Sequence, residues 1–409
     1  MTMSEQPQFD ILVVGGGMVG SALALGLSRQ GWNVGLVEGA DRKALMQDPE
    51  EALSVEDFDP RVSAISVASQ RLLEQLGVWS DITAGRHCPY QTMTVWDGDG
   101  TGRIQFEAAE LRAPALGTII ENRRIVQALF DALADSAVTL IDGVRVSGWW
   151  QDGHTRGIRL EDGQTFGARL VVAADGAHSR LRQWVGLPTR EWDYGQQAIV
   201  CTVRTAQSHR YTAWQRFSPT GPLAFLPLLS ESGDEHFCSI VWSQDTEEAR
   251  RLMGLDDHAF KAELERAIER ELGAVDLVSR RYAFPLRQRH AKEYIAPGFA
   301  LVGDAAHTIH PLAGQGANLG YGDVRALLDE LASARSKGID PDNELVLARY
   351  QRRRKGENLA MMAAMEGFKQ LFGRDELTLR WLRNTGMRWL NQLGPIKNRI
   401  AAEAMGLDA

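Results

Sequence analysis

The sequence predicts an α/β protein made of a nucleotide-binding domain, an inserted antiparallel sheet and a helical C-terminal region. Three observations carry this prediction: a glycine-rich turn between an apolar strand and an Ala/Leu-rich helix, strand-like alternation in the middle of the chain, and a last segment without strand signals. A chain of 409 residues is long enough for two or more domains.

The first glycine-rich turn lies within residues 11–38, ILVVGGGMVGSALALGLSRQGWNVGLVE. Gly15, Gly17 and Gly20 form G-x-G-x-x-G directly after a strand and at the start of a helix, which is the context of a Rossmann-like dinucleotide site. In such a site the glycines permit the tight turn, the approach of a pyrophosphate and the close packing of helix on strand. Glu38 closes the second strand and is expected to hold the adenosine ribose. The alternative is a βαβ crossover that binds no nucleotide.

A second glycine-rich segment follows an apolar run near residue 300. Gly303 and Asp304 end that run, and Gly314, Gly316 and Asn318 precede a stretch compatible with a helix. An Asp at the end of a strand is well placed to accept hydrogen bonds from sugar hydroxyls, and glycines let the main chain approach a flat ligand. Taken alone, the segment is equally compatible with a tight strand–turn–helix connection.

A third signal stands between these two. Residues 168–174 predict a buried strand, and Asp175 and Gly176 then form a turn signal. Ser179 and Arg182 complete the pattern D-G-x-x-S-x-x-R and are placed to face a phosphate or a carboxylate. A capped turn that leads into a surface helix is the alternative interpretation.

Composition limits the class of protein. The net charge of −8 argues against nucleic-acid binding, which needs a basic surface. Cys88, Cys201 and Cys238 show no metal-ligand spacing and fit a reducing compartment. Residues 1–10 lack a signal-peptide core, and no apolar run is long enough to cross a bilayer. We therefore expect a cytoplasmic location.

The three signals, in this order, resemble those of the class A flavin monooxygenases of the p-hydroxybenzoate hydroxylase type. The resemblance implies FAD as the cofactor, NAD(P)H as a transient reductant and O₂ as the cosubstrate. The positions that match the family's FAD-binding motifs are Gly15, Gly17, Gly20, Glu38, Asp175, Gly176, Gly303 and Asp304. The resemblance also assigns to the cofactor site Arg61, Gly314, Gln315, Gly316 and Asn318. A second G-x-G-x-x-G for a resident nicotinamide nucleotide is absent from the sequence.

A narrower resemblance, from about residue 9 to residue 407, is to the bacterial ubiquinone-biosynthesis hydroxylases. The stretches that carry it are DPRVSAIS at 59–66, LGVW at 76–79, AFLPL at 224–228 and HTIHPLAGQG at 307–316. Residues 239–243, 247–249 and 404–407 are most similar to the 2-polyprenylphenol (2-octaprenylphenol) hydroxylases. Residues 88–90 and 108–111 are more similar to the demethoxyubiquinol hydroxylases.

This resemblance implies a reaction and a division of the chain. NAD(P)H would reduce FAD, and a flavin C4a-hydroperoxide would hydroxylate a 2-polyprenylphenol ortho to its hydroxyl; the alternative is demethoxyubiquinol or another ring position. More distant alternatives are an FAD-dependent reductase or oxidase of an isoprenoid or amine, and a non-catalytic lipid-binding protein. The FAD-binding domain is expected at 1–88, 118–185 and 289–345, the substrate-binding sheet at 89–117 and 186–288, and the helical region at 346–409.

Several side chains are candidates for this chemistry. By resemblance, His310 and Pro311 lie beside the isoalloxazine, with His310 as a proton-handling group or a loop histidine bonded to backbone. Phe225, Pro227 and Trp242 are candidates for the substrate pocket, although core packing is the commoner role of such residues.

Two further signals have competing explanations. Arg61 lies in Val/Ile/Ser-rich sequence, where an unpaired buried charge is costly, so we expect a cofactor or a salt bridge as its partner. His307 and His310 have the spacing of an H-x-x-H metal pair, but no third ligand is suggested and we expect no metal.

The last segment raises the question of partners. Residues 352–355 form a basic run, RRRK, that is followed by Met and Phe at helical spacing. Such a helix either lies on an anionic membrane, here the inner face of the cytoplasmic membrane, or packs on its own domain. Expected partners are a polyprenylated phenol or quinol and other ubiquinone-biosynthesis proteins, and the sequence is compatible with a homo-oligomer.

Overall fold

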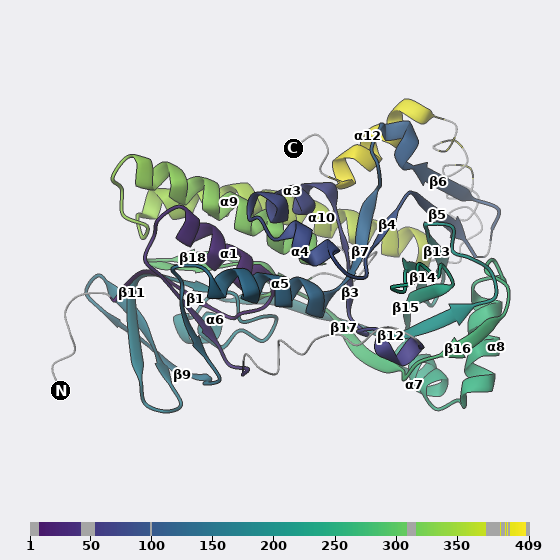
Figure 1. Cartoon of the computed structure of the whole chain (residues 1–409), viewed down its shortest axis with the longest axis horizontal. Coiled ribbons are helices and arrows are strands. Elements are labelled where there is room, and N and C mark those ends of the chain that lie inside the picture. Colours follow the sequence, from purple (N-terminus) through teal and green to yellow (C-terminus); the bar gives the residue numbers. More distant parts are fainter. Residues whose placement is uncertain are drawn as a thin grey trace.

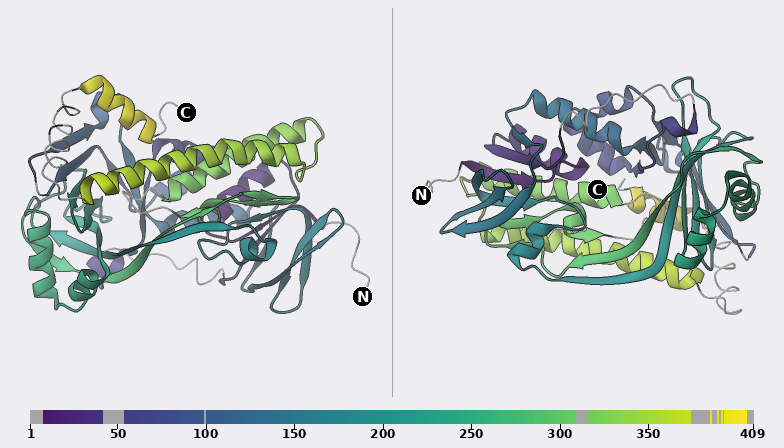
Figure 2. Two further views of the ribbon diagram at one scale, coloured as in Figure 1. Left: turned by 180° about the vertical axis from the view of Figure 1, so that it is seen from behind. Right: turned by 90° about the horizontal axis from the view of Figure 1, so that it is seen from below.

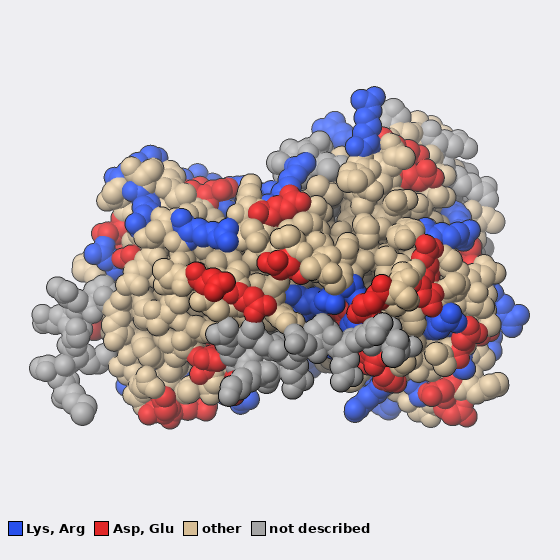
Figure 3. Space-filling model, in the orientation of Figure 1, with Lys and Arg blue, Asp and Glu red and all other residues tan. Residues whose placement is uncertain are grey.

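The computed structural model describes residues 8–41, 54–98, 100–308 and 316–373, residues 385, 389 and 391, and residues 393–405. Two large sheets lie next to each other, with helices packed around the first and on the outer side of the second (Figure 1). On the face drawn in Figure 3, Lys and Arg side chains are intermixed with Asp and Glu.

The first sheet has a parallel centre, as expected for buried strands that are apolar throughout. Its order is β18-β19-β11-β1-β2-β8, with β10 and β9 continuing antiparallel from β11. The strands are β1 (Phe9–Val14), β2 (Val34–Glu38), β8 (Thr139–Asp142), β9 (Val146–Asp152), β10 (Thr155–Leu160), β11 (Thr165–Ala173), β18 (Ile295–Ala296) and β19 (Phe299–Leu301). Strands β2, β1, β11 and β19 are therefore parallel neighbours.

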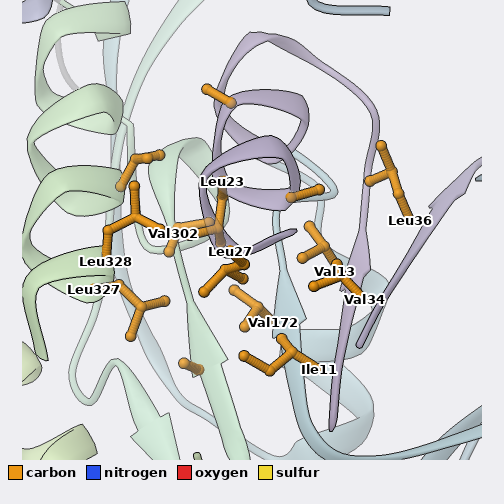
Figure 4. Close-up of a cluster of buried hydrophobic side chains, with 14 of the residues drawn as sticks. Ile11, Val13, Leu23, Leu27, Val34, Leu36, Val172, Val302, Leu327 and Leu328 are labelled. Atoms are coloured by element: carbon orange, nitrogen blue, oxygen red, sulfur yellow. The ribbon is translucent and has the colours of Figure 1, made fainter. Parts of the chain in front are cut away.

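Helix α1 (Met18–Arg29) shows why this domain is stable. Every residue from Gly20 to Leu27 is buried, so the helix is enclosed on all sides. Figure 4 shows Leu23 and Leu27 of this helix between the sheet and Leu327 and Leu328 of α9 (Gly316–Ser336). The core of the domain thus joins the N-terminal βαβ unit to a helix almost three hundred residues later.

The second sheet is mixed but mostly antiparallel, in the order β20-β17-β12-β15-β14-β13-β5-β6, with β16 beside β12. Its strands are β5 (Thr92–Asp97), β6 (Arg103–Glu107), β12 (Thr189–Thr205), β13 (Thr212–Ser218), β14 (Gly221–Leu228), β15 (Phe237–Asp245), β16 (Val275–Val278), β17 (Tyr282–Ala291) and β20 (His307–Thr308). The long strands β12 and β17 run from one half of the molecule into the other (Figure 2). Helices α7 (Thr246–Met253) and α8 (Asp257–Ala267) pack on one face.

Smaller elements connect the two sheets. A three-stranded sheet, β3-β7-β4, consists of β3 (Val62–Ile65), β7 (Gly117–Glu121) and β4 (Cys88–Tyr90). The connecting helices are η1 (Val55–Asp57), α3 (Val67–Gln75), α4 (Trp79–Thr83), η2 (Ala108–Leu111), α5 (Asn122–Ala134), α6 (Arg180–Val185) and η3 (Gly303–Ala305). The three cysteines are buried and free.

The C-terminal region is helical, as predicted. Helix α10 (Glu344–Gly373) packs along α9 and contacts both large sheets, and α12 (Gly394–Met405) packs on η2 and β6 (Figure 2). The basic run is mostly paired within the chain: Arg353 with Asp329, Lys355 with Glu293, and Arg354 with buried groups considered below. None of the helices in the described ranges combines the length and apolar character that a membrane crossing requires.

The predicted α/β fold with an antiparallel second sheet and a helical end is confirmed. The domain limits stay a prediction, and the strands of the second sheet come from 92–107, 189–291 and 307–308. This last pair lies inside the segment expected for the first domain, because β20 adds to the edge strand β17.

Candidate functional site

The first turn brings two glycines into contacts that no other residue permits. Gly15 has a φ of +110°, and a Cβ there would lie 2.3 Å from the carbonyl oxygen of Ala174. A Cβ on Gly20 would lie 1.9 Å from the carbonyl oxygen of Gly15. The turn, the strand β11 and helix α1 are therefore in backbone contact, as the spacing of the glycines predicts.

The third glycine of the turn borders open space. In the part of the chain that the structure describes, nothing lies within 4 Å of a Cβ built on Gly17, which is the N-cap residue of α1. Among the described residues no side chain caps this helix, so its first N–H groups have no side-chain partner there and suit a ligand. An uncapped helix N-terminus with free space in front of it suits a phosphate group.

Glu38 lies at the C-terminal end of β2, beside this turn. Its two carboxylate oxygens accept hydrogen bonds from the backbone N–H groups of Gly16, at 2.6 Å, and Ala40, at 2.8 Å. These two bonds fix the orientation of the carboxylate. Since a carboxylate offers about four lone-pair sites, two remain for ribose hydroxyls.

Asp175 follows β11 and has two roles that the sequence analysis treated as alternatives. Its Oδ2 accepts from the N–H of Arg180 at 3.0 Å, which caps the short helix α6. Its Oδ1 is buried and has no hydrogen-bond partner among the described residues. Burial raises the pKa of this carboxyl group. The Asp175 side chain lies beside the hollow described next.

These residues line one hollow of about 440 Å³ at the carboxyl ends of β1, β2 and β11. A crevice at this edge is the usual ligand site of an open α/β sheet. Its walls are formed by Val14, Gly15, Gly17, Val37, Glu38, Gly39, Arg145, Val146, Ala174, Asp175, Gly176, His178, Arg180, Leu181 and Trp184. The structure thus brings together the first and third sequence signals.

The second glycine turn is η3, directly after β19. Gly303 has a φ of +59°, and a Cβ there would lie 3.2 Å from the side chain of Val19 in α1. The next residue, Asp304, is exposed, and its carboxylate hydrogen-bonds to none of the described residues. Surrounding protein atoms nevertheless desolvate this group and raise its pKa. Asp304 is therefore an available acceptor on a turn that packs against α1.

Arg182 links the second and third signals, which the sequence analysis did not foresee. This side chain is buried, and its guanidinium donates to the carbonyl oxygens of Ala305, at 2.6 Å, and Ala177, at 3.1 Å. Ser179 accepts from the N–H of Arg182 at 3.0 Å. The expectation that these two side chains face a phosphate or carboxylate is wrong, because both are bonded to the protein's own backbone.

Asn318 and Gly316 open helix α9 near the other signals. The Asn318 amide accepts from the N–H of Ser66, at 3.0 Å, and the hydroxyl of Ser69, at 2.8 Å, and donates to the carbonyl oxygen of Ala64 at 2.8 Å. The side chain therefore ties α9 to β3 and α3, and its cofactor contact stays a prediction. A Cβ built on Gly316 would have no neighbour within 4 Å among the residues that the structure describes.

The expectation about Arg61 was built on burial, and this premise is wrong. The side chain is exposed, and it forms no ion pair within the described residues. The salt-bridge alternative is therefore not found there. The backbone around Arg61 is held in place, because Asp59 accepts from its N–H at 2.9 Å. A cofactor contact of the exposed guanidinium stays a prediction.

The three candidates for the substrate pocket share one face of the second sheet. Phe225, Pro227 and Trp242 are paired with or next to residues of the cluster that includes α7 and α8. The ring of Trp242 lies 6.1 Å from that of Phe260 in α8. This placement gives Phe225 and Trp242 a role in the core on the outer side of the sheet, and it does not support a contact with a ligand between the domains.

The opposite face of the same strands meets the smaller sheet. Ala224 and Leu226 of β14 belong to a cluster with Ile119 of β7 and Cys88 of β4, and Val241 of β15 packs against it. The strict alternation of a strand explains the difference, since neighbouring residues point to opposite faces. The face toward the first domain is thus carried by the neighbours of the predicted residues.

Four predicted residues, His310, Pro311, Gly314 and Gln315, lie outside the described residues. Their roles beside the cofactor stay predictions. His307 is described and buried, and its Nε2 donates to Asp323 at 2.6 Å. Within the described ranges no group of three or more His, Cys, Asp or Glu side chains is arranged to hold a metal ion.

Comparison with known proteins identifies relatives along the whole chain. A family model described as "FAD binding domain" matches residues 8–363. The 3-demethoxyubiquinol 3-hydroxylase of Escherichia coli (strain K12) is 40% identical over 406 residues, covering 99% of this chain and 100% of that protein. The ubiquinone hydroxylase UbiL of Rhodospirillum rubrum is 37% identical, covering 99% of this chain and 91% of that protein.

Solved structures with the same fold extend this likeness. The structure of PqsL, a probable FAD-dependent monooxygenase from Pseudomonas aeruginosa, superposes with a TM-score of 0.75 over 93% of this chain and 99% of that one. The two sequences are 24% identical, so this likeness concerns the fold alone.

Proposed function

The chain belongs to the family of FAD-dependent ubiquinone-biosynthesis hydroxylases, and from this premise we propose that it hydroxylates the ring of a demethoxyubiquinol. The observation that carries the proposal is the 40% identity with the Escherichia coli hydroxylase over essentially the full length of both chains. The prediction of a 2-polyprenylphenol as the substrate is not confirmed by these relatives. It becomes the competing outcome of the test below.

The residues of the hollow and of the second glycine turn fit FAD on three structural grounds. The space in front of Gly17 and the free N–H groups of α1 suit a pyrophosphate. The carboxylate of Glu38 keeps acceptor sites for ribose hydroxyls. Asp175, which lines the hollow, and the exposed Asp304 supply further carboxylates, at the third and second signals.

When bound, FAD would supply the redox chemistry of a monooxygenase, with NAD(P)H as the reductant and O₂ as the source of the oxygen atom that is added to the ring. The chain's own residues bind and orient. Glu38 and α1 would hold the ADP half, and Asp304 the ribityl side. In this scheme the protein contributes by positioning the ring and by excluding water from the reacting atoms.

A ring substrate would enter between the two domains, a usual place for a ligand site. Its wall on the second sheet would be the face that carries Ala224, Leu226 and Val241, because Phe225 and Trp242 are occupied with α7 and α8. The polyprenyl chain of the substrate resides in a membrane, so we expect a peripheral contact with the inner face of the cytoplasmic membrane and with other enzymes of the pathway.

Complementation tests the substrate. The chain is expressed in Escherichia coli strains that each lack one of the three ring hydroxylases, and the accumulated quinone intermediates are identified by mass spectrometry. We expect restored ubiquinone in the strain without 3-demethoxyubiquinol 3-hydroxylase and loss of its demethoxy intermediate. An Asp304→Ala variant is the control for dependence on FAD.

The other outcomes are informative. Rescue only of the strain blocked at 2-polyprenylphenol would contradict the demethoxyubiquinol assignment and support the competing substrate. Rescue of no strain, with no quinol-dependent NAD(P)H oxidation by the purified protein, would contradict the proposed pathway.

A further inference from the structure

A cluster of buried polar side chains lies beneath the second glycine turn, and its centre is Asp323 of α9. This carboxylate is 0% exposed. It accepts from the N–H of Gly303 at 2.9 Å, from His307 Nε2 at 2.6 Å, from Arg354 Nε at 2.7 Å and from Asn358 Nδ2 at 3.4 Å. Four donors from two distant stretches of the chain, residues 303–307 and 354–358, thus converge on one side chain.

The donors match the capacity of the carboxylate. An ionised Asp offers about four lone-pair sites, and each is directed to one donor. Burial alone would raise the pKa of Asp323, but His307 and Arg354 outweigh it and hold the pKa below its usual range. Asp323 is therefore a charged acceptor, and its environment is built for the charge.

The contact that matters for the site is the one with Gly303. Its N–H is buried, and without Asp323 it would lose its hydrogen-bond partner. Gly303 begins the turn η3, and Arg182 holds the carbonyl oxygen of Ala305 at the other end. Asp304 lies between these two contacts, and its carboxylate is bonded to none of the described residues. The direction of that carboxylate thus depends on the two ends of the turn.

The cluster also joins the C-terminal helix to the turn. Arg354 of α10 donates to Asp323 and, through another nitrogen, to the carbonyl oxygen of Leu319 at 3.1 Å and to Asn358 at 2.9 Å. Arg354 is the third residue of the basic run, yet it is 3% exposed. Its role is inside the protein.

We propose that Asp323 is a positioning residue for the cofactor: by holding Gly303, it fixes the turn on which Asp304 presents its carboxylate to the ribityl side of FAD. The proposal rests on the proposed function only in taking FAD as the ligand. Asp323 itself contacts no cofactor. Its effect on FAD passes through Asp304, which makes the two residues energetically coupled.

Asp323→Asn is the first variant. An amide has two acceptor sites and two N–H donors, so it cannot accept from four N–H groups. We expect the Kd for FAD of the apoprotein, measured by titration calorimetry, to rise at least tenfold. The Kd for ADP should change less than twofold, because ADP occupies only the first turn and Glu38. A general loss of structure would weaken the binding of both ligands.

A double-mutant cycle distinguishes positioning from a separate structural effect. Asp304→Ala alone should weaken the binding of FAD and leave the binding of ADP unchanged. If Asp323 acts through Asp304, the double variant Asp304→Ala/Asp323→Asn should bind FAD about as weakly as Asp304→Ala. If the increases in the Kd for FAD caused by the two single changes multiply in the double variant, the proposal is wrong.

Tyr350→Phe is the matched control. The Tyr350 hydroxyl is buried and donates to the carbonyl oxygen of Leu301 at 2.6 Å, just before the turn. Its removal should lower the melting temperature and leave the Kd ratio of FAD to ADP unchanged. If Tyr350→Phe shifts that ratio as much as Asp323→Asn, the effect is not specific to Gly303 and the proposal is wrong.

Asp323→Glu covers the case in which the Asn variant does not fold. It keeps the charge for Arg354 and displaces the carboxylate by one methylene. If Asp323→Glu weakens the binding of FAD more than the binding of ADP, the positioning role is supported. An unchanged affinity for FAD contradicts it. Failure of the wild-type apoprotein to bind FAD would instead refute the cofactor assignment, so the two failures are distinguishable.

Discussion

The two glycine turns of the site are held in place by different forces. The turn at Gly15–Gly20 is formed mainly by backbone packing: its neighbours are the carbonyl oxygens of Ala174 and Gly15, and Glu38, which accepts from the N–H of Gly16, comes from the same βαβ unit. The turn at Gly303 is held by side chains that come from far along the chain, Asp323 and Arg182. The first turn depends on the absence of side-chain atoms, and the second on the presence of particular ones.

This difference predicts how each turn fails. Adding atoms damages the first turn, because backbone atoms cannot move aside at low cost. Removing a charge damages the second, because its partner is then left buried and unpaired. The predictions below use this contrast, beginning with the variant that should lose both stability and FAD.

Gly20→Val should have the largest effect. Its Cβ would lie 1.9 Å from the carbonyl oxygen of Gly15, so strand and helix would have to separate. We expect a loss of roughly 4 kcal/mol in the free energy of unfolding and no retained FAD. Urea denaturation and the absorbance of bound flavin measure the two.

Gly17→Ala is the comparison, since a Cβ at this position has no described neighbour within 4 Å. The free energy of unfolding of this variant should stay within about 1 kcal/mol of the wild-type value. Its binding of FAD should be weaker, because the methyl group enters the space assigned to the pyrophosphate. Equal destabilisation by both variants would contradict the packing account of this turn.

Arg354→Met and Arg353→Met compare adjacent positions of α10. Arg354 is buried against Asp323, and Arg353 is paired with Asp329 on the surface. Loss of one partner of a buried pair costs about 3–5 kcal/mol, and loss of a surface pair about 0–1 kcal/mol. Chemical denaturation should therefore separate the variants clearly. Similar, small losses would show that the Asp323 cluster does not stabilise the fold.

The last prediction concerns pH. The imidazole of His290, in β17, forms a hydrogen bond of 2.9 Å with the hydroxyl of Tyr294, next to the Asp323 cluster. Burial, together with the charge of His307, lowers the pKa of His290 to about 4. The unfolded chain takes up a proton near pH 6.5, whereas the folded chain does so only near pH 4. Stability should therefore fall as the pH decreases through this window, by roughly 1.4 kcal/mol for each unit of the shift.

His290→Asn isolates this contribution. The difference in unfolding free energy between the wild type and the variant, measured in urea from pH 7 to pH 4, should change in favour of the variant as the pH falls. A difference that does not vary with pH would mean that His290 is not held in its neutral form.

The contrast between the turns also explains what could be predicted from sequence. Gly15, Gly17, Gly20 and Glu38 act within one βαβ unit, so their spacing carries the geometry. The partner of Gly303 is an Asp on a helix whose orientation depends on the whole domain. Spacing alone contains no signal for that contact.

Two other predictions were limited for the same reason. Alternation places Phe225 and Trp242 on one face of the second sheet, but only the packing of α7 and α8 shows which face it is. Arg354 belongs to a basic run of the kind expected on a protein surface. Its burial follows from the packing of α10 along α9. In each case the missing information was a contact between distant segments.

Oxygen labelling tests the central claim most directly. The purified FAD-loaded protein is supplied with NAD(P)H, a short-chain demethoxyubiquinol and ¹⁸O₂, and the product is analysed by mass spectrometry. The account predicts a ring-hydroxylated product with one ¹⁸O atom per molecule, and none when the label is in water. Oxidation of NAD(P)H or of the quinol without ¹⁸O in the ring would identify a reductase or oxidase and contradict the assignment as a monooxygenase.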